Sequence, residues 1–215
     1  GLGVVTIMSG LMILLHKKMG INDRLLLQDA FNLNSLSGLV RFVKKVVIGT
    51  LVIEGIGALL YMTVFIPDFG SKGIWISIFT SVSAFCNAGI DIIAENSLCD
   101  YALNPMVNTV TCLLIVIGGI GYIVWWDIIR VIKNIRHNKR KIFGNLTLHS
   151  KIAIISTLLL IIVGAILVFV LEYDNPQTLK DYTLLQKIEV SFFQSVTTRT
   201  AGFATLPQEN LTNAT

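Results

Sequence analysis

Two short stretches decide how this chain folds: Ser83-Ala-Phe-Cys-Asn-Ala-Gly-Ile-Asp91 and Ser195-Val-Thr-Thr-Arg-Thr-Ala-Gly-Phe-Ala-Thr205. Aligned on Gly89 and Gly202, both read polar-Ala-Gly-apolar. Each stretch follows a hydrophobic segment that is too short to cross a bilayer, and that segment follows one that is long enough. The pattern therefore predicts two copies of one unit, which consists of a span, a half-span and a glycine turn.

The composition is that of a membrane protein. Of 215 residues, 53% are hydrophobic and only 14% are charged, whereas soluble domains carry about 25% charged residues. Three runs approach or reach the roughly 20 apolar residues that a membrane helix needs: 46–66, 105–126 and 152–171. A fourth apolar run, 2–15, is interpreted as the second half of a further helix. We therefore expect an all-α integral membrane fold.

The charges are distributed unevenly along the chain, whose net charge is +4. Lysine and arginine are concentrated in residues 16–45 and 130–151, while acids dominate 67–104 and 172–215. By the positive-inside rule the basic loops lie in the cytoplasm and both glycine turns face outside. A nucleic-acid patch is the weaker alternative, because the basic loops directly flank apolar spans. This pattern predicts a multi-pass protein of the plasma membrane.

An internal repeat runs through the sequence. Ile56-Gly-Ala-Leu-Leu resembles Val163-Gly-Ala-Ile-Leu, and Gly89 resembles Gly202, at offsets of 107 and 113. Because each unit contains an even number of spans, successive copies run in the same direction, which implies a rotation axis along the membrane normal. The half-span 74–86 is about 20 Å long as a helix and stops inside a hydrocarbon core about 30 Å thick. Residues 187–196 can play the same part, and a short helix in an extracellular cap is the alternative.

The glycine turns have the chemistry to bind a dehydrated cation. Backbone carbonyls can replace the water of the ion without a charged side chain that would trap it, and glycine adopts the positive φ that aims successive carbonyls at one axis. The ends of the half-helices add partial negative charge. The candidate ion-binding backbone comprises Asn87, Ala88, Gly89, Ile90, Thr200, Ala201, Gly202 and Phe203.

Several side chains are candidates for supporting roles. Arg199 would repel a cation on the ion path, so we expect it behind the turn, paired with Glu189 or Asp91. Asp91 either braces the turn in this way or concentrates cations at the mouth. Glu54 lies mid-span, where an acid is a functional candidate; our hypothesis is that it holds helices together. The run Gly118–Gly121 allows close helix contact or a bend.

At this point the sequence resembles the Trk/Ktr/HKT cation transporters. The segments 83–89 and 197–203 look like the second and third filter loops of that superfamily, most closely those of the bacterial KtrB-type (NtpJ-like) membrane subunits. The resemblance carries the filter glycines over to Gly89 and Gly202. It implies four M1–P–M2 repeats with re-entrant pore helices and pseudo-fourfold, potassium-channel-like architecture. It also implies potassium uptake, a homodimer and a cytoplasmic nucleotide-binding regulatory ring, with K+ as the transported ion and no cofactor in this chain.

The same resemblance divides the chain into parts of a larger whole. Residues 1–20 would be the end of M2 of repeat 1 and 21–43 a cytoplasmic loop. Residues 44–140 would form repeat 2, and 141–215 would begin repeat 3 with M1, pore helix and filter. Only about two repeats are therefore expected here.

Two other function classes compete with cation transport. One is a non-transporting membrane scaffold, such as an accessory subunit of a rotary ATPase. The other is an intramembrane enzyme, which ranks lowest because the spans contain no paired carboxylates, metal cluster, Ser/His set or Cys/His set. We therefore expect a protein that is not an enzyme. The sequence leaves the choice between K+ and Na+ open.

Overall fold

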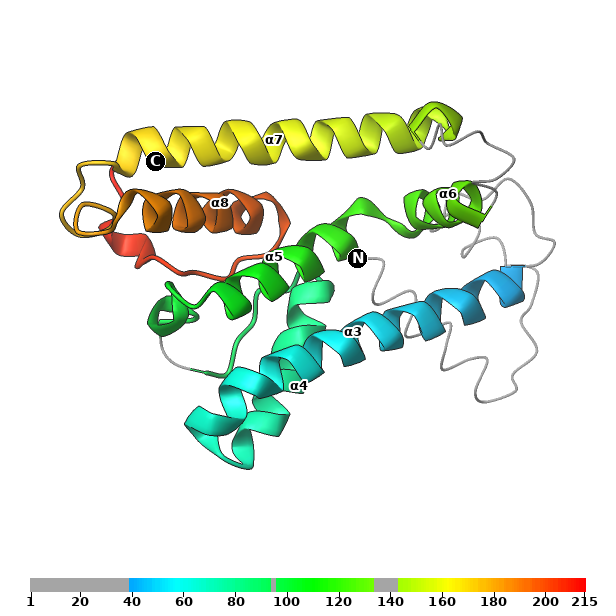
Figure 1. The fold of residues 1–215 in the computed structure, drawn as a ribbon, viewed down its shortest axis with the longest axis horizontal. Helices are drawn as coiled ribbons and strands as arrows, with labels where there is room; N and C mark the ends of the chain where they lie inside the picture. The colour runs from blue at the N-terminus through cyan, green and yellow to red at the C-terminus, as the bar shows by residue number, and fades with distance from the viewer. Residues whose placement is uncertain (1–38, 94–95, 134–142) are drawn as a thin grey trace. The chain divides into compact units, whose positions relative to one another are not determined.

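The computed structural model describes residues 39–93, 96–133 and 143–215. The chain forms two compact units, Gly1–Gly55 and Ile56–Thr215. The described residues contain helices and no strand, as the sequence predicts. The helices are α3 (Leu39–Phe69), α4 (Lys72–Phe85), α5 (Pro105–Ile120), α6 (Tyr122–Lys133), α7 (Leu148–Glu172) and α8 (Leu184–Thr200), with short 3₁₀ turns η1 (Cys99–Tyr101), η2 (Phe143–Asn145) and η3 (Gln208–Asn210) (Figure 1). The predicted run 2–15 and most of the first basic loop lie outside the described residues.

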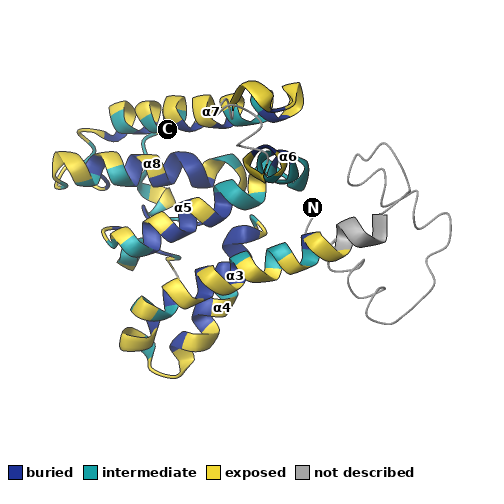
Figure 2. Ribbon diagram, turned by 45° about the vertical axis from the view of Figure 1, so that its right-hand side comes forward, coloured by how far each residue is buried: buried dark blue, intermediate teal, exposed yellow. Residues whose placement is uncertain are grey.

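Two described helices are long and apolar enough to cross a membrane, and these are Lys44–Phe69 and Leu148–Glu172. The pair α5 and α6 adds a third crossing if it is counted as one span. Helix α7 shows its large apolar side chains to the surroundings along most of its length, for example Leu159 at 56% and Val170 at 64% exposure (Figure 2). A soluble protein rarely exposes so continuous an apolar surface, so the chain is a membrane protein.

The predicted span 105–126 is not one straight helix. It divides at Gly121, whose φ of 92° and ψ of 148° interrupt the helical path. Helices α5 and α6 meet there at an angle of 96°. The bend is one of the two interpretations that the sequence allowed for the run Gly118–Gly121, and it forms because glycine readily adopts a positive φ that ends a helix.

Both half-helices are present. Helix α4 has 14 residues, close to the predicted 74–86, and α8 has 17 residues, which is longer than the predicted 187–196. Helix α8 begins early because Thr183 and Gln186 form a capping box, in which the backbone N–H of Thr183 donates to Gln186 Oε1 at 2.9 Å. Such a box satisfies donors that the first helical turn leaves free.

The same helix contact occurs in each copy of the repeat. A Cβ on Gly57 of α3 would lie 2.5 Å from Ser81 Oγ of α4, and a Cβ on Gly164 of α7 would overlap Ser195 Oγ of α8. Ser195 Oγ also donates to Ile161 O at 2.7 Å. Each long helix thus has a glycine where the serine of its half-helix approaches, so the two copies pair span with half-helix in the same way.

A buried carboxylate fixes the C-terminal end of α7 in the second copy. Glu172, the last residue of α7, is fully buried and accepts from Asn175 Nδ2 at 2.6 Å and Thr178 Oγ1 at 2.7 Å. It also accepts from the Thr212 N–H and hydroxyl at 2.9 and 2.8 Å and from the Thr215 hydroxyl. These bonds tie the segment that follows the second glycine turn back to α7.

The C-terminal end of α3 in the first copy is held by an aromatic contact. Tyr101 of η1 donates to Asp68 Oδ2 at 2.6 Å and packs edge-on against Phe65, their ring centroids 5.2 Å apart. Desolvation, followed by the hydrogen bond to the Asp68 carboxylate, raises the pKa of the Tyr101 phenol. Tyr101 therefore stays protonated and remains a hydrogen-bond donor to α3.

Candidate functional site

The structure brings the two glycine turns into contact. Gly89 has a φ of +65° and Gly202 a φ of +120°. A Cβ on Gly89 would overlap the carbonyl oxygen of Ala201 and lie 2.8 Å from Gly202 Cα. Only glycine allows the backbones to approach this closely in this conformation. The two segments that the sequence singled out therefore form one site, although they lie far apart in the chain.

A hydroxyl at the end of each half-helix holds the turn that follows it. Ser83 Oγ donates to Ile90 O at 2.5 Å in the first copy, and Thr197 Oγ1 donates to Phe203 O at 2.7 Å in the second. Thr197 Oγ1 also accepts from the Gly202 N–H at 3.2 Å. Both turns thus share a bond from the half-helix to the residue after the glycine, which the sequence did not predict.

The segments beyond the two turns also meet. The N–H of Leu98 donates to Ala204 O at 2.9 Å, and the N–H of Ala204 donates to Ser97 Oγ at 3.3 Å. Cys99 Sγ lies 3.7 Å from the same Ala204 oxygen. Burial, with smaller contributions from the Asp100 and Asp91 carboxylates, raises the pKa of the Cys99 thiol. Asp91 is therefore near this junction, where it is partly exposed.

Asn87 connects the first turn to both the second turn and α5. Its backbone is left-handed, with a φ of +52°, a conformation that asparagine tolerates better than most residues. In the orientation assigned from its hydrogen-bond partners, Nδ2 donates to Thr200 Oγ1 at 3.0 Å and to Ile115 O at 3.2 Å. Its Oδ1 accepts from the Gly119 N–H at 3.2 Å. The polar residues before the two glycines are thus bonded to each other.

Arg199 is held in a different way from the one predicted. Its Nη1 donates to Thr157 Oγ1 of α7 at 2.8 Å, and no ion pair with Glu189 or Asp91 is found among the described residues. Glu189 instead accepts from Asn108 Nδ2 at 3.0 Å. The expected carboxylate partner was wrong because a buried hydroxyl of the neighbouring span lies within reach.

Glu54 lies in α3 and is buried, with 9% of its surface exposed.

Asp127 and Arg130 form the ion pair that their spacing allows. Asp127 does more than this, because its Oδ2 accepts from the N–H and the hydroxyl of Thr147, each at 2.8 Å. Thr147 is the N-cap of α7, so Asp127 joins α6 to the start of the next span.

The break at Gly121 directly follows the last residue of α5. A bend was one of the two interpretations of the run Gly118–Gly121, and close helix contact was the other. Both interpretations hold, because a Cβ on Gly118 would overlap Phe85 O of α4 while Gly121 forms the bend. The indole of Trp125 in α6 donates to Ile117 O of α5 at 2.9 Å. Sequence reasoning missed this bond, since a tryptophan near the end of an apolar run is typical of the membrane interface.

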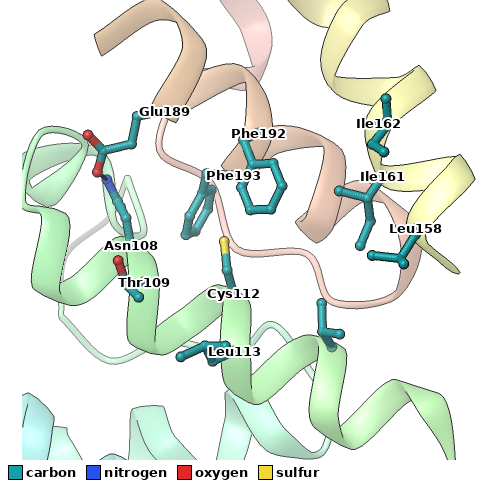
Figure 3. Close-up of a pocket in the computed structure, with 11 residues that line it drawn as sticks. Asn108, Thr109, Cys112, Leu113, Leu158, Ile161, Ile162, Glu189, Phe192 and Phe193 are labelled. Atoms are coloured by element: carbon teal, nitrogen blue, oxygen red, sulfur yellow. Dashed lines mark hydrogen bonds between the residues drawn. The ribbon is translucent and has the colours of Figure 1, made fainter. Parts of the chain in front are cut away.

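A separate crevice of about 320 Å³ opens between α5, α7 and α8 (Figure 3). Its lining is apolar apart from one end, where Asn108 and Glu189 point toward each other and share the hydrogen bond described above. Phe192 and Phe193 of α8 face Cys112 of α5 across it. An apolar crevice of this kind cannot replace the water of a cation.

The turns offer backbone oxygen rather than side-chain ligands. Ala88, Thr200 and Gly202 are exposed, and in the described part of the chain no group of three His, Cys, Asp or Glu residues could hold a metal ion. Carbonyls at the ends of two half-helices suit a monovalent cation that must enter and leave.

Comparisons with known proteins show which proteins this chain is similar to. The sequence matches the TrkH family, described as cation transport protein, over residues 1–215. It is 39% identical over 215 residues to the potassium/sodium uptake protein NtpJ of Enterococcus hirae, covering all of this chain and 45% of that protein. It is 37% identical over 207 residues to the Ktr system potassium uptake protein B of Bacillus subtilis, covering 96% and 44%. The chain thus spans about half the length of the curated relatives it matches.

Proposed function

This chain belongs to the TrkH family of cation transport proteins, and from that premise we propose that it contributes two filter turns to a protein that takes up potassium. One observation carries the proposal: Gly89 meets Ala201 and Gly202 backbone to backbone, at the ends of two half-helices. Of the eight residues 87–90 and 200–203, the first three of each turn then supply carbonyl oxygens for the ion, while Ile90 O and Phe203 O accept hydrogen bonds from the half-helices. Two relatives named as uptake proteins for potassium, or for potassium and sodium, support the choice of a monovalent cation.

The path proposed here is completed by further repeats around a pseudo-fourfold axis. The two copies described above account for two of its sides. Both filter turns face the outside of the plasma membrane, because the basic segments flank the opposite ends of the spans. K+ is the transported ion, and no cofactor takes part in its passage through this chain.

We further propose a homodimer whose cytoplasmic face binds a nucleotide-binding regulatory ring. The name of the Bacillus subtilis relative places that protein in a Ktr system, which supports a partner of this kind. Co-purification of the full-length protein with a nucleotide-binding subunit, and loss of that association when the basic segment 130–141 is neutralised, would test it. A protein that purifies alone and monomeric would contradict this part of the proposal.

The filter assignment is tested by two matched glycine substitutions in the full-length protein. Gly89 and Gly70 have nearly the same φ, +65° and +60°, but only Gly89 has neighbouring atoms within 4 Å of an added Cβ. Rubidium uptake by cells that lack their own potassium uptake measures the effect of each alanine. We expect Gly89→Ala to lose uptake and Gly70→Ala to keep it.

Three results would contradict the proposal. Equal loss in both variants would mean that the positive φ alone matters. Full uptake in Gly89→Ala would show that the turns do not line the ion path. Absent uptake in the unmodified protein would favour a non-transporting membrane scaffold.

A further inference from the structure

The side chain of Asn87 occupies an unusual position in α5. Its Nδ2 donates to Ile115 O and its Oδ1 accepts from the Gly119 N–H, both at 3.2 Å. Residues 115 and 119 are the acceptor and donor that an α-helix pairs directly, four positions apart. One carboxamide thus binds both members of a single pair in the helical hydrogen-bond pattern. Insertion of a side chain there is a recognised cause of helix distortion, and α5 ends one residue later, at Ile120.

Helix α5 has room for this side chain because Gly118 and Gly119 carry no side chains of their own. A Cβ on Gly118 would overlap Phe85 O, so the backbone of α5 lies directly on the end of α4. Arg199 closes the other side, since its Nη2 would lie 2.9 Å from a Cβ on Gly119. The last turn of α5 before the break is therefore contacted by groups that adjoin both filter turns.

The same carboxamide also reaches the second turn. Its Nδ2 lies 3.0 Å from Thr200 Oγ1, and Thr200 directly precedes Ala201 and Gly202. Asn87 itself lies two residues before Gly89. Asn87 is thus part of the first turn, and its side chain binds the second turn at Thr200 and helix α5 at Ile115 and Gly119.

We propose that the Asn87 carboxamide is a positioning group that sets the two filter turns against the inner helix and holds the bend between α5 and α6. This inference rests on the proposed function, because it assigns the side chain a task in the ion path whose backbone the turns provide. The side chain does not touch the ion. It fixes the spacing of the carbonyls that do, and it links that spacing to the angle of the inner helix.

Four variants of the full-length protein test the proposal. Asn87→Gly removes the carboxamide and leaves a residue that adopts a positive φ without strain. Thr200→Val removes one bond of the bridge at nearly constant volume, and Thr200→Ser keeps it. Asn96→Gly removes an exposed asparagine of the outer loop as the matched control. Rubidium uptake is measured for each, per transporter in the membrane, with Na+ as competitor.

A positioning role predicts changes in ion recognition rather than in protein amount. We expect Asn87→Gly to raise the KM for Rb+ at least tenfold and to weaken discrimination against Na+. Thr200→Val should act in the same direction by about threefold, and Thr200→Ser, which keeps the hydroxyl, should reverse most of that rise. Asn96→Gly should stay within twofold of the unmodified protein. Because the two side chains form one bridge, the double variant should be no worse than Asn87→Gly alone.

A merely structural role would lower the amount of transporter and leave KM and ion preference unchanged, and that result would overturn the proposal. If Asn87→Gly fails to reach the membrane, Thr200→Val decides, because an unchanged KM there is equally contrary. Loss of uptake in Gly89→Ala together with normal ion recognition in Asn87→Gly would refute this inference and leave the proposed function standing. Normal uptake in Gly89→Ala would refute both the proposed function and this inference.

A distance measurement tests separately whether the Asn87 carboxamide holds the bend between α5 and α6. Spin labels at Leu113 of α5 and Ile132 of α6, both about half exposed, report the distance across the break. We expect one narrow distance distribution in the otherwise unmodified protein and a broad one in Asn87→Gly. Equally narrow distributions in both proteins would show that the carboxamide does not hold the angle.

Discussion

Replacing Gly118 by alanine should lower the stability of the protein only slightly but raise its KM for rubidium strongly. Alanine at an exposed helical position is favoured over glycine by about 1 kcal/mol. At Gly118, however, the new Cβ would overlap Phe85 O and lie 2.9 Å from Phe85 C, whereas ordinary contact begins at 3.4 Å. The Phe85 backbone must therefore move by at least the difference between these two distances. Overpacking of this kind costs about 1–3 kcal/mol, so the net loss of stability is about 1 kcal/mol.

The displacement falls next to the filter, since Phe85 is two residues before Asn87 and four before Gly89. Functional sites tolerate displacements of only about 0.5 Å, so we expect the KM for rubidium to rise at least tenfold in Gly118→Ala. Gly55→Ala is the control, because no atom lies within 4 Å of its added Cβ. It should be more stable than the unmodified protein by up to about 1 kcal/mol, with unchanged KM.

Thermal unfolding of the purified protein and rubidium uptake by cells measure the two effects. A Gly118→Ala protein with the KM of the unmodified protein would refute the reasoning, because it would show that the turn is not set by the contact between α4 and α5. A gain of stability equal to that of Gly55→Ala would show that Phe85 moves away without cost.

Three further substitutions address contacts outside the turns. Glu172→Gln should lower stability by about 2–3 kcal/mol, because a buried carboxylate loses charge-assisted bonds, with KM unchanged; an unaltered unfolding temperature would contradict this. Asp127→Ala should cost about 2 kcal/mol and speed hydrogen exchange in the first turn of α7, and equal protection there would argue against the cap. Trp125→Phe leaves Ile117 O without its indole donor and should cost about 1–2 kcal/mol, seen as a lower unfolding temperature; no change would show that water replaces the indole.

Hydropathy and charge predicted most of the architecture. The three apolar runs 46–66, 105–126 and 152–171 all lie within helices or the bent pair, and α4 follows its prediction closely. These signals succeed because in a membrane every backbone group must be bonded within the protein, which leaves helices as the simplest outcome for an apolar run. The glycine turns were found because they repeat. The same residue pattern after the same kind of half-span, in two places, is much harder to attribute to chance than a single glycine.

The contacts that shape the site could not be predicted in the same way. Arg199 bonds Thr157 rather than a carboxylate, because partner choice depends on which groups of neighbouring helices come within hydrogen-bonding distance. The bend at Gly121 was one of two interpretations of the run Gly118–Gly121, and hydropathy gives neither its positive φ nor its angle of 96°. Asn87 could be identified only as a polar residue before a glycine. Its three partners come from segments that lie far from it along the chain, and no local pattern records such pairings.

The bonds from Ser83 to Ile90 O and from Thr197 to Phe203 O limit how many ions the proposed path can hold. Each of these carbonyls is directed back to its own half-helix, so the oxygens free to face an ion come from the three residues before it in each turn. Long filters with several sites in series conduct quickly because adjacent ions repel and displace one another. A short row of oxygens holds few ions at once, and an ion bound there leaves at its own dissociation rate. Tighter binding then means slower passage, which suits uptake from dilute surroundings better than rapid electrical signalling.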